Sequence, residues 1–243
     1  MILLIRKRQV VLIAFLCCVL AGASAVFWYG RETSTAAFAP RAGVPVTVIV
    51  DPGHGGEDGG AVAVDGTSES QRNLEIALRV NDLLRLTGQQ TEMTREEDVS
   101  IHSAGAETAR QRKVSDLQNR VALVNGTENA VLLSIHQNSL PSSPVTHGAQ
   151  VFWNGQEGAE GLAKIVQARL NECVNLQRAK QAKPIDSSFY LMKKVTAPGI
   201  IVECGFLSNQ EETALLHQPS YQLKLAVAIT AGYLGCTAGE EVP

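Results

Sequence analysis

The sequence lacks the features that mark several large classes of protein. Its five cysteines are spread over 243 residues without a Cys-x-x-Cys pair, which argues against a zinc ribbon and against a disulfide scaffold. Positive charge is not in excess, because the formal net charge is −3, and this argues against a nucleic-acid partner. The chain also has no internal repeat and no low-complexity tract. Its hydrophobic content of 45% is normal for a globular protein.

The N-terminal residues 1–28 predict a signal peptide or a membrane anchor. Arg6-Lys7-Arg8 precedes an apolar stretch over residues 10–28, the pattern of an export signal whose positive end stays in the cytoplasm. The stretch is long enough to span a bilayer. It also contains small-residue patterns at 21–23 and 23–25 that signal peptidase could accept. Both outcomes place the rest of the chain outside the cytoplasm.

The remaining residues predict one domain. Residues 29–44 are rich in Ala, Thr, Ser and Pro, which indicates a linker. About 200 residues follow, enough for one good core and too few for two ordinary domains. We therefore expect a single domain over residues 45–236 and a short tail over 237–243.

One histidine stands out at the end of a predicted strand. Residues 46–50 form a β-branched apolar run, typical of a buried strand. The run leads into Asp51-Pro52-Gly53-His54-Gly55-Gly56. Glycines on both sides let the backbone turn and leave the imidazole of His54 unshielded, which suits a ligand. A single histidine is more often structural or merely exposed, so His54 needs support from other residues.

That support comes from three further segments. Apolar runs over 130–135 and 199–202 predict strands that lead to His136 and Glu203. Ser68 and Gln71 fit a capping box, which places Glu69 in the first turn of a helix that Gly88 ends. In open α/β sheets, ligands bind outside the carboxyl ends of the strands. We therefore expect these three residues and His54 to converge at one sheet edge.

Each candidate also has a plainer explanation. Glu69 could complement the positive end of its helix dipole, and His136 could be an ordinary strand-end histidine. Glu203 is harder to explain so, because a carboxylate after a buried strand is partly desolvated and costs stability without a partner or a task. The other histidines are weaker candidates. They are His102 and His147, in loop-like stretches, and His217, near a helix end.

Two histidines and a carboxylate form a donor set suited to catalytic zinc. Such sites use three protein ligands and leave the fourth tetrahedral position to water. His54, Glu69 and His136 would fill the three places with one zinc per chain, and Glu203 would accept a proton from the water. The spacing differs from the helical His-Glu-x-x-His pattern of zincins.

Together these motifs resemble the zinc-dependent N-acetylmuramoyl-L-alanine amidases. The resemblance covers residues 46–235 in the right order and is carried by DPGHGG at 51–56, Glu69 with Asn73-Leu74, SIHQN at 134–138 and VECGFLSN at 202–209. It implies a single α/β domain with a mixed, mostly parallel sheet flanked by helices and the zinc site at the carboxyl ends of the strands. It implies hydrolysis of the amide between N-acetylmuramic acid and L-alanine of the peptidoglycan stem peptide. The family's ligands fall on His54, Glu69 and His136, and its catalytic glutamate on Glu203. Asn138, Arg95 and Arg120 are expected to contact substrate.

A narrower resemblance is to the germination-specific amidases of spore formers. It rests on residues 115–120 and 190–209 and on the lack of cell-wall-binding repeats. It implies spore-cortex peptidoglycan as substrate, with muramic δ-lactam formed after the peptide is removed. It places the protein at the outer face of the cytoplasmic membrane or in the cortex space of the forespore. An accessory lipoprotein activator is among the partners it implies.

Two other functions remain open from the residues alone. A zinc carboxypeptidase would use the same chemistry on a bond within the stem peptide. A non-catalytic wall-binding module would keep the fold with a vestigial site, although the presence of Glu203 argues against it. Cys204 is predicted to pack as a small apolar residue and not to act as a nucleophile.

The rest of the chain predicts alternating strands and helices. A long loop over 95–113 is expected near the active edge, since such loops are often functional. A second capping box, Ser208 with Glu211, is expected to open a short helix ending near His217. The remaining elements are strands over 89–94 and 149–153 and helices over 114–125, 157–173 and 219–234, the last ended by Gly235.

Overall fold

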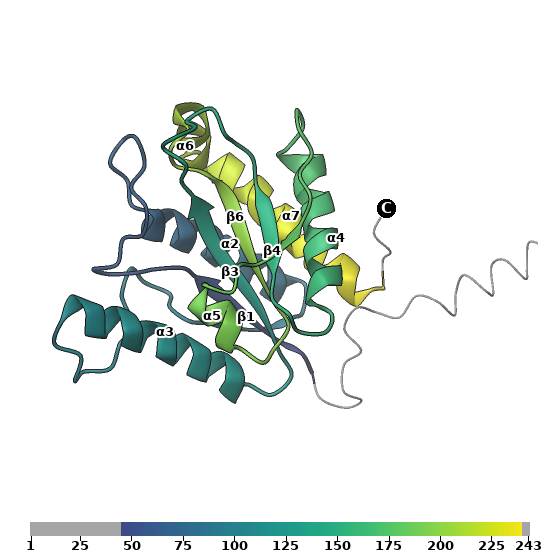
Figure 1. Cartoon of the computed structure of the whole chain (residues 1–243). Coiled ribbons are helices and arrows are strands. Elements are labelled where there is room, and N and C mark those ends of the chain that lie inside the picture. Colours follow the sequence, from purple (N-terminus) through teal and green to yellow (C-terminus); the bar gives the residue numbers. More distant parts are fainter. Residues whose placement is uncertain (1–44, 240–243) are drawn as a thin grey trace, which may run out of the picture.

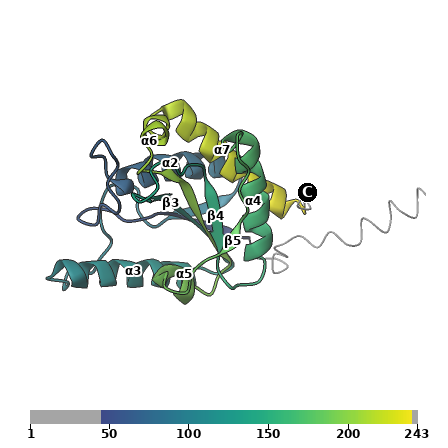
Figure 2. The same ribbon diagram turned by 45° about the horizontal axis from the view of Figure 1, so that its top comes forward.

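The computed structural model describes residues 45–239, which form an α/β domain of three layers. A mixed sheet lies between two layers of helices, and one helical layer is clear in each of the two views (Figures 1 and 2). The predicted fold class is therefore confirmed. The predicted signal or anchor over 1–28, the linker over 29–44 and the end of the tail lie outside the described residues. Within residues 45–239, no helix is both long and apolar enough to cross a membrane.

The sheet follows the order β2-β1-β3-β6-β4-β5. β1, β2, β3 and β6 run parallel, and β4 pairs antiparallel with β6. This places the ends of β1, β3 and β6 side by side at one edge. The strands are β1 Thr47–Pro52, β2 Gln90–Met93, β3 Ala130–Asn138, β4 Gln150–Trp153, β5 Lys183–Pro184 and β6 Gly199–Phe206.

Helices cover both faces of the sheet. The helices are α2 Glu69–Leu86, α3 Ala109–Gly126, α4 Ala159–Cys173, α5 Tyr190–Lys194, α6 Gln210–Leu216 and α7 Pro219–Thr237. α2, α4 and α7 pack together over one face, and α3 and α5 lie over the other (Figure 2). Alternate residues of β1 face opposite layers. Val48 and Val50 join the larger core cluster, whereas Ile49 joins the smaller one. This two-sided burial explains why the central strands are apolar throughout.

Two predicted strands are longer than their apolar runs. β3 continues through His136 to Asn138, and β6 continues through Glu203 to Phe206. His136 and Glu203 therefore lie within the strands, directly opposite each other in the parallel register. The pairing extends past the apolar residues because the neighbouring strand still satisfies their backbone groups. Two side chains that can bind a metal or transfer a proton are thus held as neighbours on adjacent, rigid strands.

Several predicted helix boundaries were wrong. α3 begins at Ala109 because Thr108 and Gln111 form a complete capping box, which shortens the predicted 95–113 loop. α7 continues through Gly235 to Thr237, because one glycine in a packed helix is tolerated at a modest cost. The prediction missed the short helix α5 and the two-residue strand β5, which are too short for a periodic signal.

Neither predicted capping box forms. Ser68 is the N-cap of α2, but its side chain contacts Ser70 Oγ at 3.2 Å instead of a backbone N–H. α6 is capped by Asn209, whose side chain accepts from Glu212 N at 2.9 Å. Ser208 instead accepts a hydrogen bond from the backbone N–H of Leu140 at 2.8 Å. In both places the serine hydroxyl binds another polar group, so the capping hydrogen bond that the local sequence predicts does not form.

Candidate metal centre

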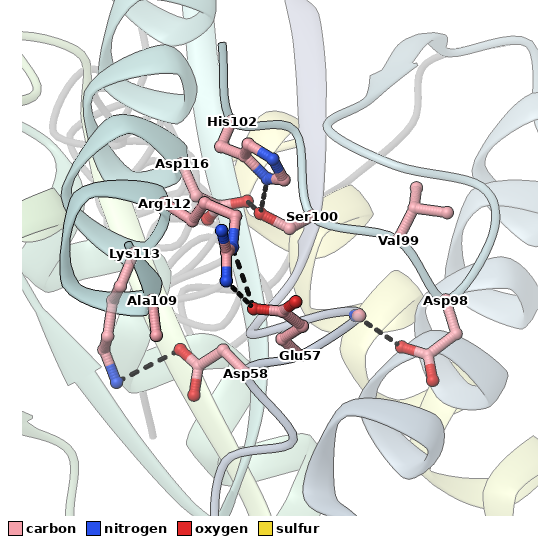
Figure 3. Close-up of a pocket in the computed structure, with 11 residues that line it drawn as sticks. Glu57, Asp58, Asp98, Val99, Ser100, His102, Ala109, Arg112, Lys113 and Asp116 are labelled. Atoms are coloured by element: carbon pink, nitrogen blue, oxygen red, sulfur yellow. Dashed lines mark hydrogen bonds and ion pairs between the residues drawn. The ribbon is translucent and has the colours of Figure 1, made fainter. Parts of the chain in front are cut away.

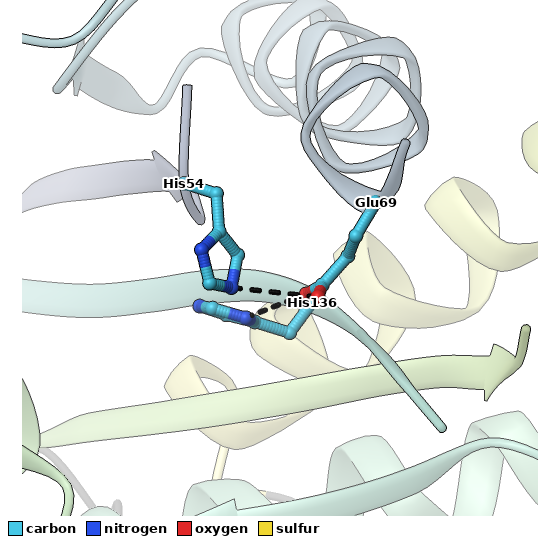
Figure 4. A group of neighbouring side chains, drawn as sticks. All are labelled: His54, Glu69 and His136. Carbon is cyan, nitrogen blue, oxygen red and sulfur yellow. Dashed lines mark hydrogen bonds and ion pairs between the residues drawn. The ribbon is translucent and has the colours of Figure 1, made fainter. Parts of the chain in front are cut away.

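The three predicted metal ligands meet at the edge of the sheet. His54 follows β1, Glu69 is the first residue of α2, and His136 lies in β3 (Figure 4). One ligand atom from each lies within 4.8 Å of the others. Glu69 Oε1 is 2.9 Å from His136 Nδ1, and Glu69 Oε2 is 3.4 Å from His54 Nε2. Three residues far apart in sequence therefore present two nitrogens and a carboxylate to one point.

Glycines within and shortly after the 51–56 motif make room for this cluster. A Cβ on Gly53 would lie 2.1 Å from His136 Nε2, so only glycine lets the backbone pass this close to the ring. A Cβ on Gly60 would lie 2.6 Å from Glu69 Oε2. His54 itself has a φ of 61°, a left-handed conformation that costs a non-glycine residue roughly 1–3 kcal/mol and concentrates at functional sites. The surrounding contacts must hold His54 in this strained position.

Arg95 and Arg120 supply those contacts from beneath the motif. Both side chains are buried. The His54 carbonyl accepts from Arg95 Nε at 2.8 Å and from Arg120 Nη2 at 2.7 Å, and the Pro52 carbonyl accepts from both arginines. Their guanidinium groups are thus engaged by the protein's own backbone. Both arginines therefore have a positioning role, and their contact with substrate stays a prediction.

The Arg120 guanidinium also joins two buried carboxylates. It forms ion pairs with Asp51, which also accepts from Ser134 and Thr94, and with Asp116, whose Oδ2 is 2.6 Å from Arg120 Nε. Burial lowers the pKa of Arg120, but the two carboxylates outweigh it and raise the pKa above its ordinary value. The cation is therefore permanent and ties α3 to the end of β1.

Glu69 is held ionised as well as oriented. It is buried and accepts hydrogen bonds from the backbone N–H groups of Ala61 and Gln137, at 2.9 and 3.1 Å, and from Asn73 at 3.2 Å. Burial raises the pKa of Glu69, but the hydrogen bond from His136 and the charges of His136 and His54 bring it down to about 2. The carboxylate is therefore in the deprotonated form that a metal ligand requires.

Glu203 lies beside the cluster in a different environment. It is only 8% exposed, and among the described residues its Oε2 has no hydrogen-bond partner. Burial raises the pKa of Glu203 to about 7, against the charge of His136 and with the help of that of Glu69. A carboxyl group that titrates near neutrality is suited to proton transfer. The neighbouring Cys204 is fully buried, and burial raises the pKa of its thiol, in keeping with the predicted packing role.

An open pocket of about 570 Å³ gives access to these residues. His54, Glu69, His136 and Glu203 all line it, and so does Asn138. On the side of α5, residues 188–191 form its wall. The contact of Asn138 with substrate stays a prediction, and the position of Asn138 in this pocket is compatible with it.

A comparison with protein families decides the class. The family model described as N-acetylmuramoyl-L-alanine amidase matches residues 48–234, which is nearly the whole described domain. The chain belongs to the N-acetylmuramoyl-L-alanine amidase family. The protein is therefore a hydrolase that acts on an amide bond of the cell wall.

Individual relatives of this amidase agree. It is 41% identical over 188 residues to the germination-specific N-acetylmuramoyl-L-alanine amidase of Bacillus subtilis, covering 77% of this chain and 78% of the relative. The CwlD amidase of Clostridioides difficile, solved in complex with the GerS lipoprotein, superposes with a TM-score of 0.75 at 35% identity over 79% of this chain and 98% of that one. AmiA of Escherichia coli is 26% identical over 81% of this chain and 78% of its own length.

The amidase site is chemically suited to a metal ion. Two imidazoles and one ionised carboxylate are ligands that divalent transition metals accept. Two of the three, Glu69 and His54, are oriented by further groups, as metal ligands usually are. His54 Nδ1 is 3.1 Å from Asp58 Oδ2. Among the described residues, the buried atoms Glu203 Oε2 and Gln137 Oε1 lack hydrogen-bond partners, as expected if something else completes the site.

Sequence reasoning missed the supporting roles of several residues at the amidase site. Asp58 lies four residues after His54 and orients its ring. The short spacing between Asp58 and His54 in the sequence could have indicated this contact. Asn73, named in the sequence only as part of the Glu69 motif, bridges Glu69 to the Gly53 carbonyl. Within residues 188–191, only Tyr190 and Leu191 carried a sequence signal, as the start of the 190–209 stretch, and it indicated no role at the site. The other three histidines lie outside the cluster. His102 contacts Ser100, His147 contacts the Val145 carbonyl, and His217 contacts Asp65.

Proposed function

We propose that the amidase is a zinc enzyme that removes the stem peptide from muramic acid in spore-cortex peptidoglycan, outside the cytoplasmic membrane. The observation that carries the zinc assignment is the cluster of His54, Glu69 and His136. Two nitrogens and one oxygen form the three-ligand set of catalytic zinc sites, whereas calcium and magnesium prefer sites made of oxygen alone. When bound, zinc supplies Lewis acidity, which polarises an amide carbonyl and makes water more acidic.

The chain's own residues would carry the remaining chemistry. Asp58 holds the His54 ring, and Asn73 with the Gln137 backbone holds the Glu69 carboxylate. Glu203 would accept the proton of the attacking water at its carboxylate and return it to the departing alanine nitrogen. Its pKa of about 7 suits both steps, because a group that titrates near the working pH can both accept and donate a proton.

The cortex assignment draws on the relatives and the N-terminal sequence. The Bacillus subtilis relative is named germination-specific, and the CwlD amidase was solved with a lipoprotein partner. From these names we infer for this chain a role in germination and a lipoprotein partner, and we place its action on the spore cortex. The basic and apolar pattern of residues 1–28 supports export to that place.

Mass spectrometry of digested peptidoglycan tests the zinc chemistry. We expect the zinc-loaded protein to release whole stem peptides and to leave muramic acid without peptide. Removal of metal with a chelator should stop the release, and added zinc should restore it. Peptides shortened at their carboxyl end would show a carboxypeptidase instead. Equal release with and without metal would overturn the role given to the three ligands.

The site of action is tested in a spore-forming host. Spores of a strain that lacks the gene should have a cortex without muramic δ-lactam, because the lactam forms only after the peptide has been removed. Complementation with the wild-type gene should restore the lactam, whereas complementation with Glu203→Gln should not. Normal lactam content in the deletion strain would remove the cortex assignment and leave the amidase activity intact.

A further inference from the structure

α5 carries two aromatic side chains that the fold does not pack. Phe189 is the N-cap of this helix, and Tyr190 is its first residue. They are 42% and 38% exposed, and neither belongs to a hydrophobic core cluster of residues 45–239. The next two residues, Leu191 and Met192, are buried in the smaller cluster. One pair of side chains thus anchors the helix and the other stays at the surface, where adjoining apolar groups mark binding sites.

The position of α5 is fixed from a second side as well. Asn125 Nδ2, on α3, donates to the Lys194 carbonyl at 3.1 Å, and Asn125 Oδ1 accepts from the Thr196 backbone N–H at 2.8 Å. α3 and α5 contact each other over the same face of the sheet (Figure 2). An aromatic side chain has few rotatable bonds, so its binding to a ligand costs little conformational entropy. The two rings therefore form a preorganised surface.

Both rings line the pocket that holds the metal ligands. Among the described residues they are the only phenylalanine, tyrosine or tryptophan side chains in its lining. Leu117 of α3 and Ile201 of β6 add apolar surface to the same pocket, and residues 188–191 carry no charge. We call Phe189 and Tyr190 the aromatic wall. A ligand bound at the metal centre has this wall beside it.

The side of the pocket next to α3 has a different character. A second hollow of about 500 Å³ adjoins it there, and Asp58 and Lys113 line both (Figure 3). Lys113 Nζ contacts Asp58 Oδ2 at 3.1 Å. Arg112 pairs with Glu57 and donates to the Glu107 carbonyl. The cations there are therefore already paired within the protein. No phenylalanine, tyrosine or tryptophan of residues 45–239 lines this hollow, so the aromatic surface lies on the α5 side alone.

The substrate of this amidase has one extended apolar surface, the C–H face of its sugar ring. In the stem peptide the first side chain is only the methyl group of alanine, and polar amide groups follow. The face of an aromatic ring carries negative partial charge, which attracts the positively polarised C–H groups of a sugar ring. Only a carbon and an oxygen atom of the lactyl group separate the scissile amide carbonyl from that ring. With the amide at the metal centre, the ring must stay in the pocket that the aromatic wall lines.

We propose that the aromatic wall binds the muramic acid ring by stacking on its C–H face, and that this contact positions the lactyl amide at the metal centre. The proposal rests on the proposed function, since it assumes that the scissile amide lies at the cluster of His54, Glu69 and His136. It makes the amidase selective for a closed sugar ring. Opening the ring removes the flat face that Phe189 and Tyr190 recognise, although the amide and the peptide are unchanged.

Two soluble disaccharide peptides test the proposal. One ends in muramic acid, and the other is its borohydride-reduced form, in which this sugar is the open-chain muramitol. We expect wild-type kcat/KM to be about tenfold higher for the closed ring, the effect of one good stacking contact. Phe189→Ala and Tyr190→Ala should each lower kcat/KM for the closed ring by roughly 2–10-fold and leave the reduced substrate unaffected. The loss should appear mainly in KM, because the ring stacks equally well before and during the reaction.

Conservative variants and a distant control separate the possible outcomes. Phe189→Tyr and Tyr190→Phe keep a flat ring and should keep the preference for the closed sugar. Leu86→Ala removes an exposed apolar side chain of α2 that lines neither pocket, and should leave both kcat/KM values unchanged.

Three results would overturn the proposal while the amidase activity stays intact. Equal wild-type rates on the two substrates would show that the closed ring is not recognised. An equal loss on both substrates in the alanine variants would place the peptide, which the substrates share, on the aromatic wall. Zinc content is measured for every variant, and loss of zinc in either alanine variant would show an effect through the metal. Cleavage of neither substrate at the muramoyl–alanine bond would count against the proposed function itself.

Discussion

Glu203→Gln is expected to lower kcat by roughly 10²–10⁴-fold, the contribution typical of a general acid–base group, while zinc binding is retained. Glutamine keeps the size of the side chain but cannot take a proton. The three ligand residues are unchanged, so the metal should stay. Because Oε2 of Glu203 is buried without a partner among the described residues, removing the charge should not destabilise the fold and could raise the melting temperature slightly.

The matched variants for this prediction are His54→Ala and His136→Ala. Each removes one of three ligands, so both zinc content and activity should be lost together. Elemental analysis of folded protein and a peptide-release assay measure the two properties in parallel. Loss of zinc in Glu203→Gln would make Glu203 a fourth ligand and exclude its role as the base. Full zinc occupancy in both histidine variants would instead contradict the ligand assignment.

Arg120→Ala should destabilise the domain by about 3–5 kcal/mol, because it leaves a buried charge without its partner. The Asp51 carboxylate is 1% exposed and pairs with Arg120. The variant also loses the two contacts that hold the Pro52 and His54 carbonyls. A loss of this size is a large part of the usual 5–15 kcal/mol of a domain. Thermal unfolding should show a fall of roughly 10 °C in Tm.

The destabilisation should shrink as the pH falls from 7 towards 4. In the wild type, burial raises the pKa of Asp51, but the charge of Arg120 and the hydrogen bonds from Ser134 and Thr94 bring it below 3.8. The stability contributed by Asp51 is thus complete above 3.8 and lost only as the pH falls through the lower folded-state pKa. Without Arg120 the cation that lowers the pKa is gone, and burial raises it. Protonation of Asp51 then removes the unpaired buried charge and reduces the destabilisation of the variant. In the wild type Asp51 stays ionised over this range, so its contribution to stability does not change.

Chemical denaturation at several pH values measures this difference. Arg110→Ala, an exposed change on the same helix, should alter stability by no more than about 0.5 kcal/mol at any of them. A constant difference between Arg120→Ala and the wild type across the range would show that the variant's cost comes from lost packing or backbone contacts. The buried ion pair would then not be the main contribution of Arg120.

The amino-acid sequence by itself determined the elements of the sheet and the donor set. The β-branched run of β1 and the apolar runs of β3 and β6 indicate buried strands, because both faces of the central sheet are covered. His54, Glu69 and His136 follow from their places next to these elements. The glycines around His54 indicate a sharp turn of the backbone there. These signals are local, since each depends on residues close together in the chain.

Only the tertiary structure decided how those residues work together. The pairing of His136 with Glu203 depends on the register between β3 and β6, which apolar runs do not fix at their ends. Burial of Glu203 in that register separates its pKa of about 7 from that of Glu69, about 2. No property of the isolated residues distinguishes the two glutamates, because solvent exclusion and neighbouring charges arise only when distant segments pack.

The same reason explains why the positioning role of the two arginines was not predicted. Arg95 and Arg120 fit a family pattern in the sequence, but only packing reveals their positioning role, because it places both beneath the His54 segment with backbone carbonyls as partners. Hydrogen bonds between residues far apart in the chain produce no periodic pattern in the sequence. The sequence therefore specified which chemistry the protein carries, and the packing of distant segments decided which side chains perform it and which hold them in place.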